Sequence, residues 1–503
     1  MLTRLSPRVD ALDLADKPFA AEVFMDTCNK YDVVVIGGGT SGVAAGIAAA
    51  RVGADTLVIE RLGALGGQMN VSGPPGFAYA NLYNERHERI IGGIITETHE
   101  RLLKDGHALP HLEPDFRGWY TFAYVDPDWW GLLIFEMMQE NGVHLLLHSL
   151  AVDVIKEGKA VRGVIVENVS GKQAIFGKVL IDCTGEGEIA ARAGAPYEIL
   201  PKEQMEPHSL AFTADGVDWE KVLDYIKNHP EEFEFERFQE NTQHKWTYDE
   251  LVARIRRIES IVELGEVMGY RSIKIKGMES GEWHGYSGIG FFLIPREGGV
   301  IQAHFQHSSQ VGNCDATNVE DLTYAEIECR RQIVMAWKFI RKYLPGFENA
   351  YITRGGPEVR IREGRRIMGD YVLTREDVIE ERKFPDVIGK SAFPAGAVHV
   401  VGPSTLATMK PPDVPKTGGS HDIPYRCLVP REVENLLVAG KAISARREAY
   451  QRFLMQTMVT GQAAGVAAAL CARDNITPRM LEADVSELQR ILIDQGAILT
   501  GTH

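Results

Sequence analysis

The stretch Tyr31–Gln68, YDVVVIGGGTSGVAAGIAAARVGADTLVIERLGALGGQ, decides the fold. Its first part, Asp32–Ile36, is apolar and β-branched, which is typical of a strand buried on both faces of a parallel sheet. Gly37, Gly39 and Gly42 follow in G-x-G-x-x-G order. In this order the first glycine permits a tight turn, the second lets the backbone approach a pyrophosphate, and the third lets a helix pack on the strand.

The residues after the glycines complete a β-α-β unit. The small-residue segment VAAGIAAARVGA predicts a helix whose first turn, with Thr40 and Ser41, aims N–H groups and a partial positive charge at the phosphates. A second strand, TLVIE, ends at Glu60, where a carboxylate binds a ribose hydroxyl and disfavours a 2′-phosphate. This order predicts a dinucleotide site rather than a glycine-rich turn in an unrelated α/β protein.

Three more segments indicate which dinucleotide is bound. Gly66 and Gly67 form a second glycine pair shortly after Glu60, where a plain NAD domain would continue into another helix. The segment KVLIDCTGEGEIAARAGAP places Thr184 and Gly185 at another strand end, and ENLLVAGKAIS ends a third strand at Gly440. We expect these segments to converge on one long ligand, so an NAD-only dehydrogenase is the less favoured interpretation.

Four separated motifs occur in order: DCTGEGE, RIREGRRIMGDYVLT, IPYRCLVP and GQAAGVAAA. With them the chain, from about Tyr31 to Asn475, resembles the FAD-dependent oxidoreductase family of two-dinucleotide-binding-domain flavoproteins. The resemblance implies an α/β fold, with a Rossmann-like FAD-binding domain of the glutathione-reductase-like type and an inserted α+β substrate or cap domain. The region QMNVSG after the second glycine pair holds no His or Cys, so we expect noncovalent FAD.

The resemblance also implies roles for residues along the cofactor, from the pyrophosphate and adenosine ribose to the ribityl chain and the flavin. A helix beginning near Arg452 would direct its N-terminus at the flavin N1/C2 edge, where reduced flavin carries negative charge. Many relatives of this fold place Asp where this chain has Lys441, so the usual carboxylate contact to the ribityl hydroxyls is not expected. The implied cofactor-binding residues are Gly37, Gly39, Thr40, Ser41, Gly42, Glu60, Arg61, Gly66, Gly67, Gln68, Thr184, Gly185, Gly440 and Gln456.

The candidates for proton transfer lie in and after a long Gly/Pro-rich segment, AFPAGAVHVVGPSTLATMKPPDVPKTGGSHDIPYRCLVP. Its length and composition predict a functional loop. His399 is our first candidate, because similar sequences often carry a histidine there, with a structural histidine as the alternative. His421 is a second candidate. Tyr425 either donates a phenolic proton or packs against the flavin, and we favour packing.

Arginines are the candidates for substrate binding. Arg362, Arg365 and Arg366 form a basic cluster in an acidic chain, and one of them, with Arg365 as our choice, could clamp a substrate carboxylate. Pairing with glutamates at a domain interface is an equally good interpretation. Arg452 matches an arginine in similar sequences and is expected to face substrate or flavin.

Changes of pattern along the chain predict its organisation. The stretch from about Trp219 to Met268 is charged and expected to be helical, between two strand-like segments. We expect an N-terminal arm, a first FAD-binding part, a substrate or cap domain, a last FAD-binding part with the active-site loop, and a C-terminal helix or tail, at residues 1–30, 31–195, 196–350, 351–475 and 476–503.

Composition limits the class of protein. A net charge of −15 argues against nucleic acid as a partner, and six scattered cysteines without a C-x-x-C pair give no metal or iron–sulfur spacing. No apolar run of about eighteen residues is apparent, so we expect no membrane span, and a cytoplasmic protein is the default. A small-molecule substrate is expected, and a homo-oligomer is one candidate assembly.

The leading hypothesis is therefore a dehydrogenase or reductase that acts by flavin hydride transfer on a small organic molecule. An electron-transfer flavoprotein subunit that works with an iron–sulfur partner is the alternative. A binding protein in which FAD is only structural is a third hypothesis. No motif names the substrate.

Overall fold

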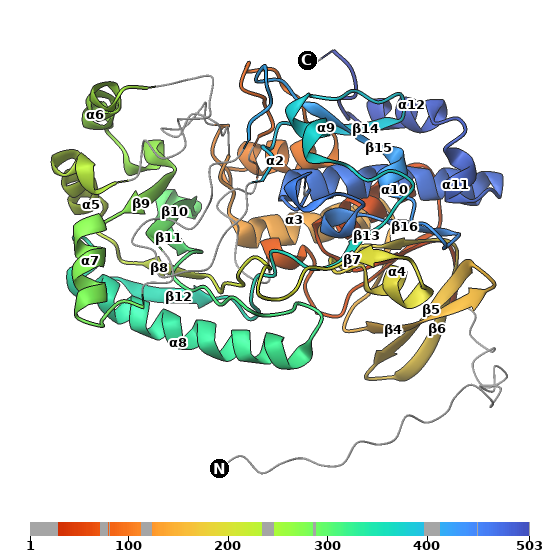
Figure 1. The fold of residues 1–503 in the computed structure, drawn as a ribbon, viewed down its shortest axis with the longest axis horizontal. Helices are drawn as coiled ribbons and strands as arrows, with labels where there is room; N and C mark the ends of the chain where they lie inside the picture. Colours follow the sequence, from red (N-terminus) through yellow and green to blue (C-terminus); the bar gives the residue numbers. More distant parts are fainter. Residues whose placement is uncertain are drawn as a thin grey trace, which may run out of the picture.

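The computed structural model describes residues 29–70, 79, 81–111, 123–233, 246–284, 288–396, 413–449 and 451–501. Its larger sheet is parallel at the centre, and the sheet continues through an antiparallel meander (Figure 1). The strands run in the order β3 (His144–Leu146), β2 (Thr56–Ile59), β1 (Asn29–Ile36), β6 (Gly171–Asp182), β5 (Ala160–Asn168) and β4 (Leu150–Glu157), with β16 (Leu436–Val438) paired to the last residues of β6.

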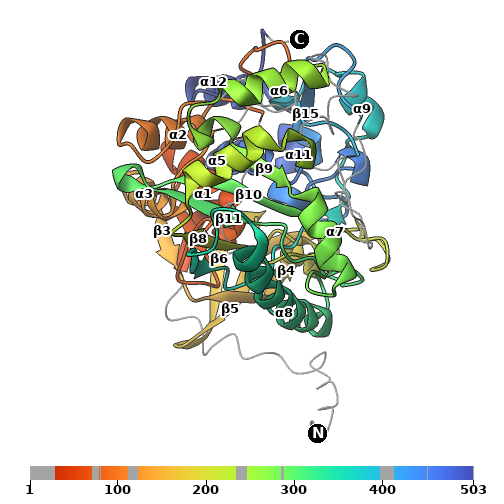
Figure 2. The ribbon, with the colours of Figure 1, turned by 90° about the vertical axis from the view of Figure 1, so that its left-hand side faces the viewer.

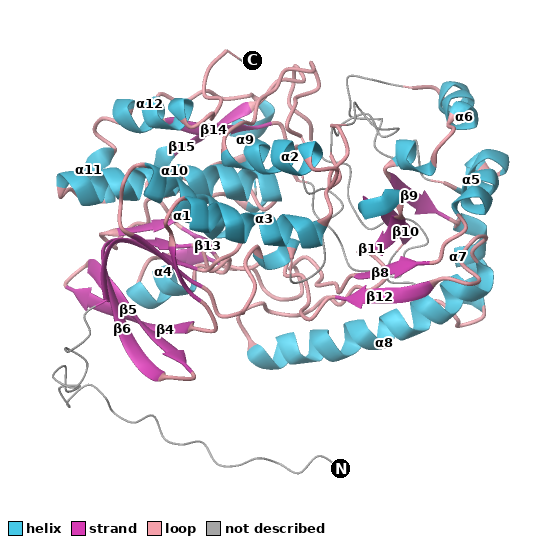
Figure 3. Ribbon diagram, turned by 180° about the vertical axis from the view of Figure 1, so that it is seen from behind, coloured by secondary structure: helices cyan, strands magenta, loops and turns pink. Residues whose placement is uncertain are grey.

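Alternate residues of β1 enter two different cores, as expected for a strand buried on both faces. Val33 and Val35 pack with the helices on one face, whereas Val34 and Ile36 pack with the meander on the other. Figure 3 shows α1 and α10 side by side along the helical face. The helices of this core are α1 (Thr40–Arg51), α2 (Ile94–Lys104), α3 (Pro127–Glu140), α10 (Leu454–Asp474), α11 (Pro478–Leu481) and α12 (Ser486–Asp494); α4 (Glu188–Ala193) packs with the meander.

A second sheet is antiparallel and has its own core. Phe291 and Leu293 of this sheet point into that core with the helices on its outer side, which faces the viewer in Figure 2. Phe292 and Ile294, on the opposite face, join the core of the first sheet. The strand order is β12 (Tyr351–Gly355), β8 (Phe212–Asp215), β11 (Ile301–Phe305), β10 (Ile289–Pro295) and β9 (Glu266–Gly269), and the helices are α5 (Trp219–Asn228), α6 (Tyr248–Arg257), α7 (Arg271–Glu279) and α8 (Val319–Tyr343).

Three short elements complete the described part of the chain. A two-stranded ladder joins β7 (Tyr197–Glu198) to β13 (Arg366–Ile367), and a hairpin-like pair joins β14 (Val387–Ser391) to β15 (His421–Pro424). Helix α9 (Arg375–Ile379) follows β13 and has a capping box. Strand β14 lies just before the predicted active-site loop, and β15 lies in the last part of that segment.

The structure differs from the sequence expectation at both ends of the second sheet. The stretch expected to be helical through Met268 ends instead in strand β9, because Gly265 has a positive φ of 70° and Val267 is buried against the second core. Strand β12 pairs with β8, so this sheet continues past residue 350. Of the predicted arm at 1–30, only the last two residues are described.

The sequence interpretation, which found no apolar run of about eighteen residues, also missed the apolar character of α10. Among the described residues it alone has the length and hydropathy to cross a membrane, and all of its apolar window is buried inside the protein. Its burial depends on close contact with α1. A Cβ on Gly461 would lie 2.1 Å from the Ser41 carbonyl oxygen, and one on Gly465 would lie 2.2 Å from that of Ala45.

We predict that Gly461→Ala lowers the stability of the fold by about 1–3 kcal/mol, although alanine is the better helix former, because the added methyl group forces α1 and α10 apart. Gly355→Ala is the matched control, since its Cβ would meet no atom within 4 Å. The midpoint of urea unfolding measures both effects. Equal midpoints for the two variants would contradict the packing described here.

Candidate active site

The two glycine turns predicted from the sequence lie side by side. The Gly66 N–H donates to the Gly38 carbonyl oxygen at 2.7 Å, and Gly39 and Gly66 form a parallel bridge. A Cβ on Gly67 would lie 3.0 Å from the Cα of Gly39. The backbones of the two glycine turns are therefore in direct contact.

The ends of three parallel strands meet at the same place. The Cys183 N–H donates to the Ile36 carbonyl oxygen at 2.8 Å, which joins the ends of β6 and β1. Gly440 follows β16, and a Cβ on it would lie 2.7 Å from Ser41 Oγ in the first turn of α1. The convergence expected from widely separated segments is thus present in the fold.

The N-terminus of α1 is uncapped by side chains. Gly39 is its N-cap residue, no side chain caps the helix, and its first turn holds no acidic residue. A Cβ on Gly39 would meet no atom nearer than Gly67 Cα at 4.0 Å, whereas one on Gly42 would lie 1.8 Å from the Gly37 carbonyl oxygen. Free N–H groups and open space at this end suit a pyrophosphate.

Glu60 is placed to bind a ribose. Its carboxylate is buried and accepts hydrogen bonds from the Gly38 N–H at 2.7 Å and the Leu62 N–H at 2.9 Å. Burial raises the pKa of Glu60, and these main-chain donors act against that rise. A carboxylate has about four acceptor positions, so room remains for ribose hydroxyls. The neighbouring Arg61 is half-exposed and forms an ion pair with Glu358.

The turn after β6 is held by Asp182. Asp182 Oδ1 accepts from Thr184 N–H at 3.0 Å and Thr184 Oγ1 at 2.7 Å, and Gly185 has a φ of 89°. Glu186, two residues beyond Thr184, forms a buried ion pair with Lys441. The lysine that replaces the usual aspartate is therefore neutralised from the DCTG turn, which explains how a cation is accommodated there.

Polar side chains also surround the N-terminus of α10. Gln456 Nε2 donates to Ser391 Oγ at 3.0 Å, while Gln456 Oε1 has no hydrogen-bond partner among the described residues. His421 lies 3.3 Å from Gln451 between ring Nε2 and amide Nε2, and its Nδ1 is unpartnered within the same described part. Burial, with Lys383 and Lys390 nearby, lowers the pKa of His421 to about 3, so the ring is neutral at pH 7.

The candidate catalytic residues fall in different places. His399 lies outside the described residues. Tyr425 is fully buried, and its hydroxyl donates to the Pro478 carbonyl oxygen at 3.0 Å, just beyond the C-terminal end of α10. Tyr425 therefore packs in the helical core, at the end of α10 away from Gln456, which fits neither proton donation nor the expected packing against the flavin.

The three arginines that are clustered in the sequence contact different partners in the structure. Arg366 is buried and paired with Glu363 at 3.0 Å, as the interface interpretation expected. The guanidinium of Arg365 stacks over Tyr197, with its Cζ atom 5.3 Å from the ring centroid. Its Nη1 donates to the Glu186 carbonyl oxygen at 3.4 Å. Arg362 instead lies near Arg452, whose guanidinium pairs with Glu206 at 3.0 Å.

Sequence reasoning missed a group of polar residues at and beside the inner face of the second sheet. His304 on β11 and His208 before β8 are both fully buried, and neither ring nitrogen of either residue has a hydrogen-bond partner in the described chain. Arg360 lies close by, with its backbone paired to that of Ser209. Strand pairing of His304 with Phe292 is the signal that places His304 on the inner face.

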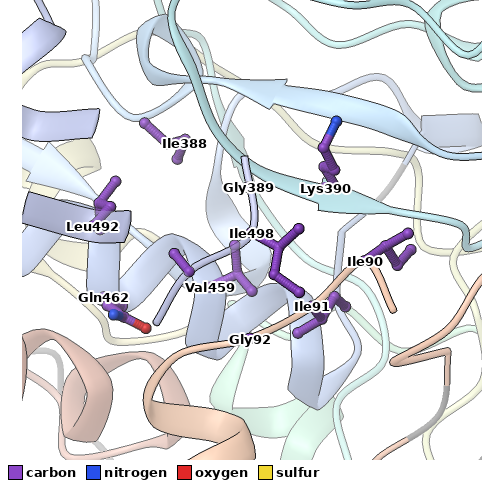
Figure 4. A pocket seen from close by; sticks show the side chains of 11 residues that line it. Ile90, Ile91, Gly92, Ile388, Gly389, Lys390, Val459, Gln462, Leu492 and Ile498 are labelled. Carbon is purple, nitrogen blue, oxygen red and sulfur yellow. The ribbon is translucent and has the colours of Figure 1, made fainter. Parts of the chain in front are cut away.

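The pocket drawn in Figure 4 is a separate feature. It lies beside α10, between Gly92, Gly389, Gln462 and Ile498, and its cavity of about 10 Å³ is large enough for about one water molecule. It is too small for a dinucleotide or an organic substrate. Among the described residues, no group of three or more His, Cys, Asp or Glu side chains is arranged to hold a metal ion.

Comparison with known families agrees with this geometry. The model of the family described as FAD dependent oxidoreductase matches residues 32–492. The chain belongs to this family. It is therefore an FAD-dependent oxidoreductase, and FAD is its cofactor. The uncapped α1 terminus, the open space at Gly39 and the buried Glu60 carboxylate fit the pyrophosphate and ribose of FAD.

Individual relatives match more weakly. Digeranylgeranylglycerophospholipid reductase from Methanoculleus marisnigri is 26% identical over 201 residues, which cover 40% of this chain and 50% of the relative. Dihydrolipoyl dehydrogenase from Trypanosoma brucei brucei is 44% identical over 63 residues, 12% of this chain and 13% of the relative. The chain thus spans half or less of the length of these curated relatives.

Among solved structures, a geranylgeranyl bacteriochlorophyll reductase-like protein from Thermoplasma acidophilum is similar over 93% of this chain and 86% of its own. Its sequence identity is 13% and its TM-score is 0.43.

We predict that Gly39→Ala weakens FAD binding at least about tenfold while the apoprotein keeps its thermal midpoint, because the methyl group fills only the space left for the pyrophosphate. Gly42→Ala is the contrasting variant, since its Cβ has no room in the protein itself and should lower the midpoint as well. Flavin released into the supernatant by acid, together with the melting curve, measures both properties. Full flavin content in Gly39→Ala would contradict the cradle.

Proposed function

We propose that this enzyme oxidises or reduces a small organic molecule by hydride transfer with noncovalently bound FAD, and that the reaction takes place on the inner face of the second sheet. The observation that carries this proposal is the contact of that sheet with the segment just after the second glycine turn and with the start of α3. Arg354 on β12 donates to the carbonyl oxygen of Asn70, three residues beyond Gly67, and also pairs with Asp128. Arg296, after β10, pairs with Asp126 and Asp128 at the start of α3.

These contacts bring the inner sheet face toward the flavin cradle. Asp126 is buried and also caps α3, accepting from the Asp128 N–H at 2.9 Å, so the docking contact is built into a folded element. Phe292 and Ile294 extend this contact into the first core. A substrate held between the sheet and the cradle would be shielded from water, as hydride transfer requires.

FAD, when bound, supplies the two-electron chemistry. The protein then has to hold the substrate, exclude water and move one proton to or from the atom adjacent to the one that gains or loses the hydride. His399 remains our first proposal for the proton carrier. His421 and His304 are held neutral by burial, which lowers the pKa of each, so both are alternative acceptors.

We further propose that the fold is of the glutathione-reductase-like class, with an inserted substrate domain beginning near residue 196. The β1–α1–β2 unit and the return of the chain through β16 to Gly440 support this class. The separate core of the second sheet supports the inserted domain, with β12 added at its end. A cytoplasmic location and a homo-oligomer remain predictions.

We predict that the purified holoenzyme is bleached under anaerobic conditions by one class of small organic compounds in a substrate screen, and not rapidly by NADH or NADPH. The reason is that the sequence offers no second clean G-x-G-x-x-G turn for a nicotinamide nucleotide. Stopped-flow absorbance of the flavin is the measurement. Rapid bleaching by NAD(P)H would show that the electrons enter by another route, and flavin that no compound and no dithionite reduces would favour a structural cofactor.

We predict that His399→Asn slows this substrate-dependent bleaching about 10²-fold or more, with unchanged flavin content, because a positioned acid–base group contributes at least about that factor. His421→Asn is the comparison variant. If His399→Asn bleaches at the wild-type rate while His421→Asn does not, the proton carrier is His421.

A further inference from the structure

Several arginines gather between the second sheet and the start of α10. Three arginines, Arg360, Arg362 and Arg452, lie near one another there, and the repulsion between them contributes to the lowered pKa values of Arg360 and Arg362. Of these three, only Arg452 has a carboxylate at ion-pair distance among the described residues, which is Glu206 at 3.0 Å. Arg362 is buried and Arg360 is partly buried, and in a chain of net charge −15 such cations without an ion pair of their own are unexpected.

Neutral acceptors occupy part of the hydrogen-bonding capacity of two of these arginines. Arg360 Nη1 donates to Gln306 Oε1 at 2.6 Å, and Arg362 Nη1 donates to the Pro207 carbonyl oxygen at 2.6 Å. Each guanidinium has about five N–H donors, so most remain available. Burial and the neighbouring arginines lower the pKa of Arg360 to about 9 and that of Arg362 to about 10, so both are still charged at pH 7.

Two histidines beside these arginines are also without partners. His304 and His208 are fully buried, and all four of their ring nitrogens lack a hydrogen-bond partner within the described residues. Burial, with Arg360 near His304 and with Lys441 and Arg362 near His208, lowers the pKa of both rings. Each ring is therefore neutral at pH 7 and keeps one N–H to donate.

A buried polar group without a partner costs free energy, so an arrangement with several of them indicates a ligand that supplies the missing partners. Here the missing partner includes an acceptor that carries negative charge, because the guanidinium groups of Arg360 and Arg362 bond only neutral acceptors among the described residues, and each neutral imidazole beside them offers one N–H donor along with one acceptor nitrogen. A carboxylate matches the planar fork of a guanidinium in two parallel hydrogen bonds.

We propose that Arg360, Arg362, His304 and His208 form an anion subsite that binds a carboxylate of the substrate. This inference rests on the proposed function for its position next to the flavin. It differs from the sequence expectation, because Arg365 and Arg366 are engaged elsewhere and Arg360 takes their place. The carboxylate would lie between β11 and the segment 360–362 and reduce the repulsion between the arginines.

The test is a titration of the holoenzyme with acetate and benzoate, and with the neutral amides acetamide and benzamide, followed by calorimetry and by the flavin difference spectrum. We expect the carboxylates to bind and perturb the flavin, and the amides to bind at least about tenfold more weakly. Inorganic phosphate is the third probe. Tighter binding of phosphate than of either carboxylate, or equal binding of acid and amide, would overturn the carboxylate assignment.

Arg360→Met should weaken benzoate binding at least about tenfold with flavin content unchanged, and Arg360→Lys should restore part of it, because lysine keeps the charge without the fork. The exposed Arg192→Met on α4 is the matched control and should bind benzoate as the wild type does. If Arg360→Met does not retain flavin, His304→Asn replaces it, with a smaller loss expected.

Wild-type affinity for benzoate in folded Arg360→Met or His304→Asn would overturn the subsite. Failure of the proposed function would look different. If benzoate binds by calorimetry in an Arg360-dependent manner but leaves the flavin spectrum unchanged, the anion subsite stands and its position beside the flavin is wrong. Binding of benzoate to the apoprotein alone would mean that FAD itself occupies the cluster, and would overturn the inference.

Discussion

The contact between α1 and α10 is the constraint on which the rest of the structure depends. Gly461 and Gly465 let the backbones of the two helices touch, and a hydrogen bond of 2.7 Å between the hydroxyl oxygens of Thr40 and Thr457 joins their first turns. Two helix N-termini, each with a partial positive charge, are thereby held at one end of the parallel sheet. This is the end where the strands β1, β6 and β16 finish, so the cradle and the strand ends share one location.

Parts of this region differ in how their buried charges are balanced. Where the protein supplies its own counter-ion, as in the pairs Lys441–Glu186 and Arg366–Glu363, a buried cation is structural. Where the described residues supply none, as at the buried Arg362 and the partly buried Arg360, we propose that a bound anion offsets the cost of burial. The same argument supports our proposals that the pyrophosphate of FAD binds at the open α1 terminus and that a substrate binds at the inner sheet face.

The sequence predicted the cradle well because its determinants are local. The spacing of Gly37, Gly39 and Gly42, and the acid at the end of the next strand, specify a turn and a helix start within about thirty residues. The convergence of the segments at Gly66, Thr184 and Gly440 was expected from glycine turns and strand ends far apart in the sequence, and the fold brings these segments together.

Features that depend on distant partners were less predictable. Strand β9 forms because its neighbour β10 pairs with it, and the preceding amphipathic pattern gave no hint of that pairing. The role of each arginine depended on which glutamate lay within reach, and the polarity of His304 and His208 became informative only when their burial and missing partners were known. Likewise, the hydrogen-bond acceptor of the Tyr425 hydroxyl is the carbonyl oxygen of Pro478, more than fifty residues further along the chain.

The most direct test of this account is a crystal structure of the purified, yellow holoenzyme. The account predicts density for one FAD, with its pyrophosphate at the N-terminus of α1 between Gly39 and Gly67, the adenosine ribose on Glu60, and the flavin ring between the start of α10 and the inner face of β11. Density for the dinucleotide away from Gly39 and Glu60, or a flavin ring whose reactive face is turned from the second sheet, would contradict it.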